Sequence, residues 1–354
     1  MNTKKGLLLF LITGITVLFL LAGCNTQESA GNEGSNDNAE DTNAEEANED
    51  SGTNDEEASS EKIVVGFSQI GAESGWRTAE TESIKETLGN DPQFDLKFSD
   101  AQQKQENQIK ALRTFIAQKV DIIALAPVVE SGWETILTEA KDAGIPVVLL
   151  DRGIDVEDES LYTSFIGSDF ILEGENAANE LINLMGEDSK VNIVELQGTV
   201  GASAANDRME GFANVISENP NYEIIKSQTG EFTRSKGKEV MEAFLKSDGD
   251  NIDAVYAHND DMALGAIQAI EEYGLKPGED IKIVSVDGIK DIFEAVADGK
   301  ANIIVECNPL LGPQLAQAAK DLQAGKEIER WIKTDESVYV GAEEAKAALP
   351  DRKY

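Results

Sequence analysis

Short apolar runs alternate with amphipathic stretches from residue 62 to the end of the chain. The runs are rich in β-branched residues and predict buried strands at 63–67, 121–126, 145–150, 191–196, 254–257, 281–286 and 303–305. Apolar residues at helical spacing predict helices near 78–88, 105–118, 133–143, 173–185, 205–218, 234–246 and 261–273. This alternation is typical of parallel sheets with helices on both faces.

The strand–helix pattern falls into two halves. One set of strands runs to about Gly167, a second runs from Val191 to Val305, and a last helix and strand follow. Asp151 and Asp287 each come directly after a predicted strand, one in each half. We therefore expect an α/β protein of two doubly wound parallel-sheet lobes with a cleft between them.

The first 24 residues have the features of an export signal. Lys4 and Lys5 precede an apolar run over residues 7–21, which is short for a membrane-spanning helix of about 20 residues. The run ends in Leu-Ala-Gly-Cys, which resembles the lipobox of bacterial lipoproteins. We expect removal of residues 1–23 and lipidation of Cys24. An uncleaved anchor is the alternative, and it too places the rest of the chain outside the cytoplasm.

Residues 24–61 differ in composition from everything that follows. Between residues 25 and 61 there is no lysine or arginine, no aromatic residue before Lys62 and no branched aliphatic residue up to Ser60. Such a segment cannot bury enough apolar surface to offset the entropy of ordering. It is predicted to be a disordered acidic tether.

Charge and rare residues exclude several kinds of function. The chain has 67 acidic and 30 basic residues, for a formal net charge of −37, which disfavours nucleic acid and anionic substrates as partners. His258 is the one histidine, which excludes zinc sites built from several histidines. If Cys24 carries the lipid, Cys307 has no partner, and a disulfide framework is excluded.

Polar residues at the ends of the predicted strands are the candidates for binding, because ligands of parallel sheets lie beyond the carboxyl ends of the strands. A sugar needs planar side chains that hydrogen-bond neighbouring hydroxyls and an aromatic face against its C–H surface. The first set comprises Asp151, Arg152, Arg208, Asn259 and Asp287. Trp76, between Ser74-Gly75 and Arg77, and Phe232 are candidates for the second.

Each candidate also has a purely structural interpretation. A strand-end aspartate often caps the next helix, and Arg152 or Arg208 could pair with surface acids. His258 is interpreted as a polar strand-end residue, and Asp260 is expected to cap the helix that follows it. The glycine-rich segment 197–203 lacks the lysine of a phosphate-binding loop, so its glycines are expected to admit a neutral ligand close to the backbone.

At these residues the chain resembles the type I periplasmic sugar-binding proteins, the ribose- and galactose-binding family of ABC transporters, over essentially all of residues 62–354. The resemblance implies a three-segment hinge, a first lobe of residues 62–166 and 307–334, and a second of 167–306 and 335–354. It is carried by the segments at residues 65–69, 73–77, 102–109, 126–129, 150–152, 195–203, 232–241 and 256–262.

The resemblance also implies roles for individual residues. The loop Glu73, Ser74, Gly75, Trp76 and Arg77 would wrap the sugar, and Asp151 with Arg152 would clamp it from the first lobe. The second lobe would bind it through Arg208, Asn259 and Asp287, with further contacts from Phe232 and Glu306.

The function implied is a non-enzymatic receptor for a monosaccharide, with galactofuranose as the expected sugar. An ABC permease and its ATPase are the implied partners, no cofactor or metal is needed, and the chain is expected to be a monomer. It would sit on the outer face of the cell membrane, held through the lipid on Cys24 alone.

Four other interpretations share parts of the pattern. A doubly wound nucleotide-using enzyme would need a glycine fingerprint after the first strand, where Gly71 and Gly75 stand four residues apart. A glycosidase would need an apolar pocket around one of two carboxylates. A repressor effector domain would need a DNA-binding motif in place of the tether. A chemosensory sugar receptor would use the same cleft with another membrane partner.

Overall fold

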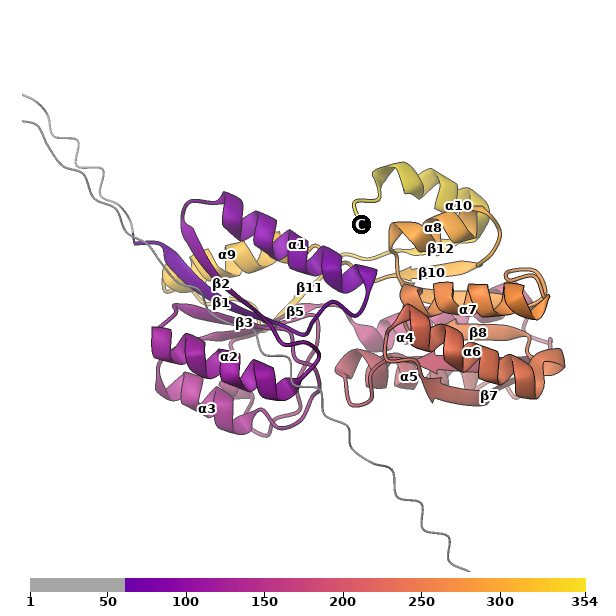
Figure 1. Ribbon diagram of the computed structural model, residues 1–354, viewed down its shortest axis with the longest axis horizontal. Helices are drawn as coiled ribbons and strands as arrows, with labels where there is room; N and C mark the ends of the chain where they lie inside the picture. The colour runs from indigo at the N-terminus through magenta and orange to yellow at the C-terminus, as the bar shows by residue number, and fades with distance from the viewer. Residues whose placement is uncertain (1–60) are drawn as a thin grey trace, which may run out of the picture. The chain divides into compact units, whose positions relative to one another are not determined.

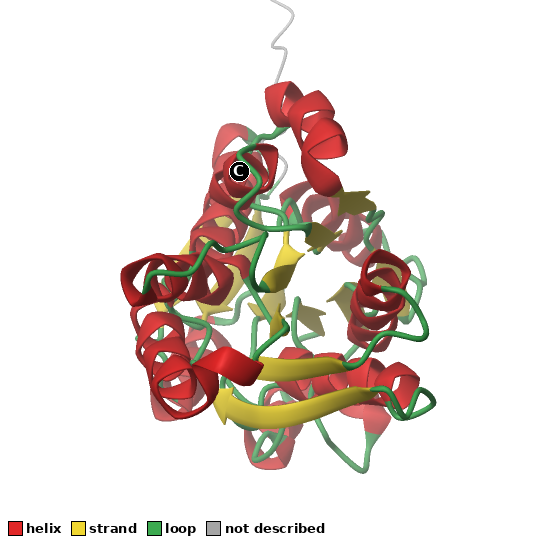
Figure 2. Ribbon diagram, turned by 90° about the vertical axis from the view of Figure 1, so that its right-hand side faces the viewer, coloured by secondary structure: helices red, strands yellow, loops and turns green. Residues whose placement is uncertain are grey.

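The chain builds two six-stranded sheets, each wrapped by helices. The computed structural model describes residues 61–354, and the predicted signal, Cys24 and nearly all of the tether lie outside them. Within that range, no helix is both long enough and apolar enough to cross a membrane. The predicted class of two parallel-sheet α/β lobes is confirmed (Figures 1 and 2).

The first sheet is parallel throughout. Its strands, in spatial order, are β11 (Trp331–Lys333), β5 (Ser164–Gly167), β4 (Val147–Leu150), β3 (Ile122–Leu125), β1 (Ile63–Gln69) and β2 (Phe94–Asp100). The helices of this lobe are α1 (Gly75–Asn90), α2 (Gln105–Gln118), α3 (Glu134–Asp142) and α9 (Gly312–Gln323). Alternation along the strands feeds two cores: Ile122 and Ala124 pack in one, and Ile123 and Leu125 in the other.

The second sheet repeats this order with one exception. Its strands are β12 (Val338–Val340), β10 (Ile303–Glu306), β9 (Lys282–Asp287), β8 (Ala254–Ala257), β6 (Val191–Gln197) and β7 (Tyr222–Thr229). Only β12 is antiparallel to its neighbour. Its helices are α4 (Phe170–Met185), α5 (Ser203–Ile216), α6 (Arg234–Asp248), α7 (Asp260–Tyr273), α8 (Lys290–Ala297) and α10 (Gly341–Ala348).

Three connections join the two sheets. The chain passes between them after β5, after β10 and after β11. Because the strands of each sheet are drawn from more than one part of the chain, each lobe is discontinuous in sequence. The lobe boundaries expected from the resemblance, at residues 166/167, 306/307 and 334/335, stay a prediction.

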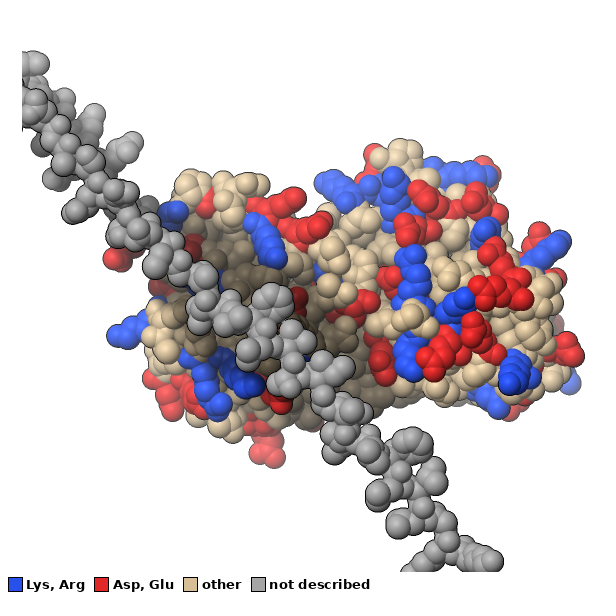
Figure 3. Space-filling view, in the orientation of Figure 1, with Lys and Arg blue, Asp and Glu red and all other residues tan. Residues whose placement is uncertain are grey.

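Most expected elements lie where the pattern placed them, and α2 and β8 begin and end at the predicted residues. The pattern missed β2, β5 and β7, and it predicted one strand without bounds after the last helix, where the structure has β11 and β12. The edge strand β2 alternates polar with apolar residues, and β7 ends in four polar residues, so neither has a continuous apolar run. The face of the molecule seen in Figure 3 carries interspersed acidic and basic side chains.

Helices α4 and α5 pack with their backbones unusually close. A Cβ atom added to Gly174 would lie 2.4 Å from the carbonyl oxygen of Arg208, and one added to Gly211 would lie 2.1 Å from that of Ile171. Neither distance is possible for a real side chain, so both helices need glycine at the crossing. This close approach brings Glu173 of α4 next to Arg208 of α5.

We predict that Gly211→Ala lowers the free energy of unfolding by about 1–3 kcal/mol, because overpacking outweighs the roughly 1 kcal/mol that alanine gains in helix propensity. Urea denaturation of the full-length chain measures this. Gly89→Ala is the matched control: this exposed glycine of α1 has no other atom within 4 Å of an added Cβ. The control should keep or slightly raise stability, and a Gly211→Ala variant as stable as the parent would refute the packing argument.

Candidate functional site

The carboxyl ends of strands from both sheets meet at one enclosed cleft. The space between its lining side chains is about 270 Å³, including open solvent at its mouth. Ten of the twelve predicted binding residues line it, and Gly75 and Glu306 do not. The lining residues are Glu73, Ser74, Trp76, Arg77, Asp151, Arg152, Ala204, Arg208, Phe232, Asn259, Asp287 and Cys307.

The first lobe presents a network of buried charges. Arg77 is ion-paired with Asp151 and Glu80, and its Nε lies 3.1 Å from Glu73 Oε1. Arg152 Nη2 lies 3.3 Å from the same Glu73 oxygen. Burial raises the pKa of Glu80 to about 7, against the opposing charge of Arg77. These side chains are almost wholly buried, so each charge depends on a partner.

Three atoms of this network are buried without a hydrogen-bond partner among residues 61–354. Glu73 Oε2 and Glu80 Oε1 accept no hydrogen bond, and Arg152 Nε donates none, although it lies 3.7 Å from Asp151 Oδ2. A buried polar group left unpaired costs about 1–3 kcal/mol. A ligand that can both donate to a carboxylate and accept from a guanidinium, as a hydroxyl group can, would recover that cost.

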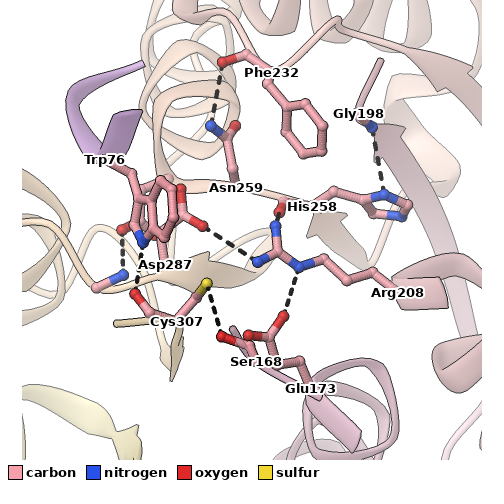
Figure 4. A network of polar contacts seen from close by, with 12 residues as sticks. Trp76, Ser168, Glu173, Gly198, Arg208, Phe232, His258, Asn259, Asp287 and Cys307 are labelled. Atoms are coloured by element: carbon pink, nitrogen blue, oxygen red, sulfur yellow. Dashed lines mark hydrogen bonds and ion pairs between the residues drawn. The ribbon is translucent and has the colours of Figure 1, made fainter. Parts of the chain in front are cut away.

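Arg208 organises the second lobe's side of the cleft (Figure 4). Its Nε lies 2.7 Å from Glu173 Oε2, its Nη1 donates to the carbonyl oxygen of His258 at 2.6 Å, and its Nη2 lies 3.4 Å from Asp287 Oδ1. The Arg208 guanidinium, from α5, therefore contacts α4 and the carboxyl ends of β8 and β9. Burial raises the pKa of Asp287 despite the charge of Arg208.

The two strand-end aspartates share a strained backbone. Asp151 has φ +60° and Asp287 has φ +121°, in the region that residues with a Cβ avoid. Such strain costs of the order of 1–3 kcal/mol and is found mainly at functional sites. Neither aspartate caps a helix, so the capping interpretation of both is wrong.

Two aromatic side chains complete the lining. Trp76 opens α1 and donates its Nε1 proton to the carbonyl oxygen of Cys307 at 2.6 Å. The Phe232 ring lies 4.9 Å from the Arg152 guanidinium and fills the space where Gly198 lacks a side chain, since a Cβ there would meet the ring at 2.0 Å. Gly198 therefore admits a protein ring, whereas the sequence had suggested close approach of a ligand.

The loops around β8 and β9 differ from expectation at Asp260. Asn259, not Asp260, is the N-cap of α7: its Oδ1 accepts from the amide of Met262 at 3.0 Å. Asp260 instead accepts from the backbone amides of Gly288 and Ile289, at 2.6 and 2.7 Å. It fixes the loop that carries Asp287, which sequence spacing could not reveal.

His258 is a buried structural residue. Its Nδ1 accepts from the amide of Gly198 at 3.3 Å, and its Nε2 lies 3.1 Å from Glu195 Oε1. An amide donor at Nδ1 places the ring proton on Nε2, facing the carboxylate. Burial lowers the pKa of His258, which favours the neutral ring.

Glu306 lies outside the cleft. One carboxylate oxygen accepts from Arg352 Nη1 at 2.7 Å and from the Tyr354 hydroxyl at 3.0 Å, and the other from the amide of Ser337 at 3.1 Å. Both oxygens are thus used within the second lobe. Sequence reasoning also missed Ala204 and Cys307, although Cys307 directly follows β10 and the strand-end rule could have found it.

Backbone amides of the first lobe bond directly to side chains of the second. The amide of Gly75 donates to Asp261 Oδ2 at 2.7 Å, which explains why Gly75 does not face the cleft. The amide of Gly153 donates to Ser203 Oγ at 2.9 Å. The lobes are therefore closed on each other around the cleft.

Glu130 makes a further contact across the lobes at the cleft rim. Its amide donates to the carbonyl oxygen of Gly201 at 2.9 Å, and its carboxylate accepts from the amide group of Asn206. Asp207 is the neighbour of Asn206 on α5. Burial, followed by repulsion from Glu130, raises the pKa of Asp207 to about 6. At this point of the rim, Glu130 of the first lobe and Asp207 of the second carry charges of the same sign.

Known proteins match this chain closely. It matches the family described as the periplasmic binding protein domain over residues 65–327. The galactofuranose-binding protein of Escherichia coli is 52% identical, over 84% of this chain and 93% of its own.

Two solved structures match with similar identity. The arabinose transporter's binding protein from Shewanella sp. ANA-3, solved with α- and β-L-arabinofuranose, is 53% identical over 82% of this chain and 95% of its own, with a TM-score of 0.79. A Mycobacterium smegmatis protein solved with β-D-fucofuranose is 54% identical over the same shares, with a TM-score of 0.80.

We predict that ligand affinity falls as the pH rises through about 6. Burial is the largest cause of the raised pKa of Asp207, and repulsion from Glu130 adds to it. Because that repulsion exists only when the lobes are closed, closure contributes part of the rise and favours the protonated form. The gain is complete below that ordinary pKa and is lost above about 6. Because Asp207 is partly exposed, we expect only about a three- to tenfold loss between about pH 5 and pH 8.

The variant Asp207→Asn isolates this effect, because asparagine has the same shape and no charge to titrate. Calorimetric titration of a cleft ligand across the pH range should give a flatter profile for Asp207→Asn. Asp188→Asn, at an exposed position of the second lobe, should keep the parental profile. If the affinity of Asp207→Asn depends on pH as steeply as that of the parent, other carboxyl groups cause the dependence.

Proposed function

The chain belongs to the periplasmic binding protein family. From this premise we propose that it binds a furanose monosaccharide in the interlobe cleft and delivers it to the permease of an ABC importer. Galactofuranose is the sugar we propose first. The observation that carries the proposal is the cleft itself: buried, closed by both lobes, and lined by arginine–carboxylate pairs and two aromatic rings.

The chemistry of the lining suits a polyhydroxylated, uncharged ligand. Glu73 Oε2 can accept from a hydroxyl, and Arg152 Nε can donate to one, so a sugar would satisfy both buried atoms. An ionic ligand would meet charges that are already paired, as in Arg77 with Asp151 and Arg208 with Asp287. Trp76 and Phe232 offer apolar faces to the C–H surface of a sugar ring.

The proposed mechanism is closure without a chemical step. The sugar binds to residues of both lobes, so it favours the closed arrangement through its greater affinity for it. Closure expels water and strengthens the polar contacts in the cleft. The closed lobes then present the surface that a membrane permease recognises, and a cytoplasmic ATPase supplies the energy for transport.

The ring form of the sugar is the finer part of the proposal. Three relatives at 52–54% identity are described with galactofuranose, arabinofuranose and fucofuranose, and these sugars share a five-membered ring. A site that hydrogen-bonds particular hydroxyls rejects an analogue lacking one, because its own buried polar groups are left unpaired. We therefore expect discrimination among sugars to be strong.

The placement of the protein is also part of the proposal. We infer that Cys24 carries a lipid and that the acidic tether separates the folded lobes from the outer face of the cell membrane. We propose a monomer that contacts the membrane through this lipid alone, with lobe boundaries as expected from the resemblance and with no cofactor.

Calorimetric titration of the full-length protein with galactofuranose, arabinose, ribose and glucose tests the proposal. We expect one-to-one binding that is tightest for galactofuranose. Preference for another sugar would keep the receptor function and change the ligand. No binding of any sugar would refute the proposed function.

We predict that Asp287→Asn weakens binding of the preferred sugar by about tenfold, because the amide replaces one carboxyl oxygen with a donor and leaves a buried hydroxyl unpaired, which costs about 1–3 kcal/mol. The substitution keeps the shape of the side chain, so the fold should persist, and circular dichroism checks this. Glu306→Gln is the control, since Glu306 lies outside the cleft, and its affinity should equal that of the parent. Equal affinities for all three proteins would remove Asp287 from the site.

A further inference from the structure

One carboxylate oxygen is hydrogen-bonded to all three connections between the lobes. Glu336 Oε1 lies in the connection after β11 and accepts from the hydroxyl of Thr334 in the same segment at 2.6 Å. It accepts from the hydroxyl of Ser168 in the connection after β5. It also accepts from the backbone amide of Asn308, in the connection after β10, at 3.2 Å.

Two residues of the cluster around this oxygen are buried, whereas Thr334 and Glu336 are half-buried. Ser168 is 4% exposed and Cys307 is 1% exposed. The Ser168 hydroxyl oxygen also lies 3.3 Å from Cys307 Sγ and 3.2 Å from Thr334 Oγ1, so the three segments touch through side chains as well. Burial raises the pKa of Glu336, and hydrogen bonds from Ser168 and Thr334 oppose that shift.

The same cluster is in contact with the cleft. A Glu173 carboxylate oxygen, Cys307 Sγ and a Glu336 carboxylate oxygen all lie within 4.8 Å of one another. Glu173 also holds Arg208 at 2.7 Å, and the carbonyl of Cys307 accepts from Trp76 (Figure 4). Arg208 and Trp76 both line the cleft. A change in the geometry of the connections can therefore reach two cleft-lining side chains through one residue each: Arg208 through Glu173, and Trp76 through Cys307.

The two carboxylates of the cluster have different kinds of partner. Arg208 supplies a guanidinium to Glu173, and the bonded oxygen of Glu336 is occupied by three donors. The carboxylate of Glu336 thus serves as a hydrogen-bond acceptor that fixes the relative positions of three chain segments. Rotation of the lobes must change the backbone angles of those segments, because they are the covalent links between the sheets.

We propose that Glu336 is a positioning residue that sets the hinge in the closed arrangement, and that the ligand-free protein populates this arrangement because Glu336 holds the three connections together. This inference rests on the proposed sugar binding for its effect on affinity, but its effect on closure does not require a sugar. Glu336 does not line the cleft. It acts on affinity by changing how much of the protein is closed before the ligand arrives.

Hydrogen–deuterium exchange of the full-length protein without ligand tests the proposal directly. The amides of Gly75, Glu130 and Gly153 donate to acceptors on the other lobe, so their protection reports closure. We expect Glu336→Ala to speed exchange at these three amides, because it lowers the closed fraction of the ligand-free protein. Amides within β1 and β6 should keep their protection.

Two matched variants distinguish the proposed positioning role of Glu336 from a general structural role. Asp335→Ala removes an exposed carboxylate from the same segment and should leave exchange at the three amides unchanged. Glu336→Gln keeps an acceptor oxygen in a neutral group, which makes weaker hydrogen bonds than a carboxylate, so its exchange should fall between the parent and Glu336→Ala. Unchanged exchange in Glu336→Ala would overturn the proposal. A glutamine variant as impaired as the alanine variant would also overturn it.

Titration with galactofuranose then measures the consequence for binding. We expect Glu336→Ala to bind about tenfold more weakly, mainly through faster dissociation, with Asp335→Ala equal to the parent. If the parent binds no sugar, the proposed function fails, and the exchange experiment still tests whether Glu336 sets the hinge. If Glu336→Ala binds as tightly as the parent, the proposed link between this carboxylate and affinity is wrong.

Discussion

The pairing of buried arginines with carboxylates is the constraint on which the cleft depends. Arg77, Arg152 and Arg208 are each about 97% buried, and a buried guanidinium is tolerated only when acceptors surround it. Each arginine therefore specifies the position of several other groups. Arg208 alone fixes Glu173, the carbonyl of His258 and Asp287 around one planar fork.

The packing of the second lobe is what allows that pairing. Glycines at positions 174 and 211 let α4 and α5 approach until Glu173 meets Arg208. Asp260 holds the loop after β9 by accepting hydrogen bonds from two of its backbone amides. Asp287, the last residue of β9, has an unfavourable positive φ angle. Local strain of this kind persists only where surrounding contacts determine the geometry. The first lobe uses the same device at Asp151, so both lobes present an aspartate in a strained turn to a common space.

The cleft and the hinge form one continuous polar system. Glu173 belongs to both, since one side of its carboxylate meets Arg208 and the cluster with Cys307 and Glu336 lies beside it. Trp76 likewise joins the cleft to the connection after β10. A protein that works by closing needs such continuity, because the free energy of ligand contact must act on the segments that bend.

The amino-acid sequence by itself determined the elements and the general location of the site. Buried strands such as β8 and helices such as α2 follow from periodicity alone, and ten cleft residues follow from strand ends and the resemblance. Periodicity did not predict edge strands such as β2, because about half of their residues are polar and they have no continuous apolar run. Only the tertiary structure decided that Asp260 holds the loop after β9, that Glu306 pairs with Arg352 outside the cleft, and that Glu336 joins the three connections. Each of these depends on which distant segments meet, and hydrogen-bond partners separated by tens to hundreds of residues leave no local pattern in the sequence.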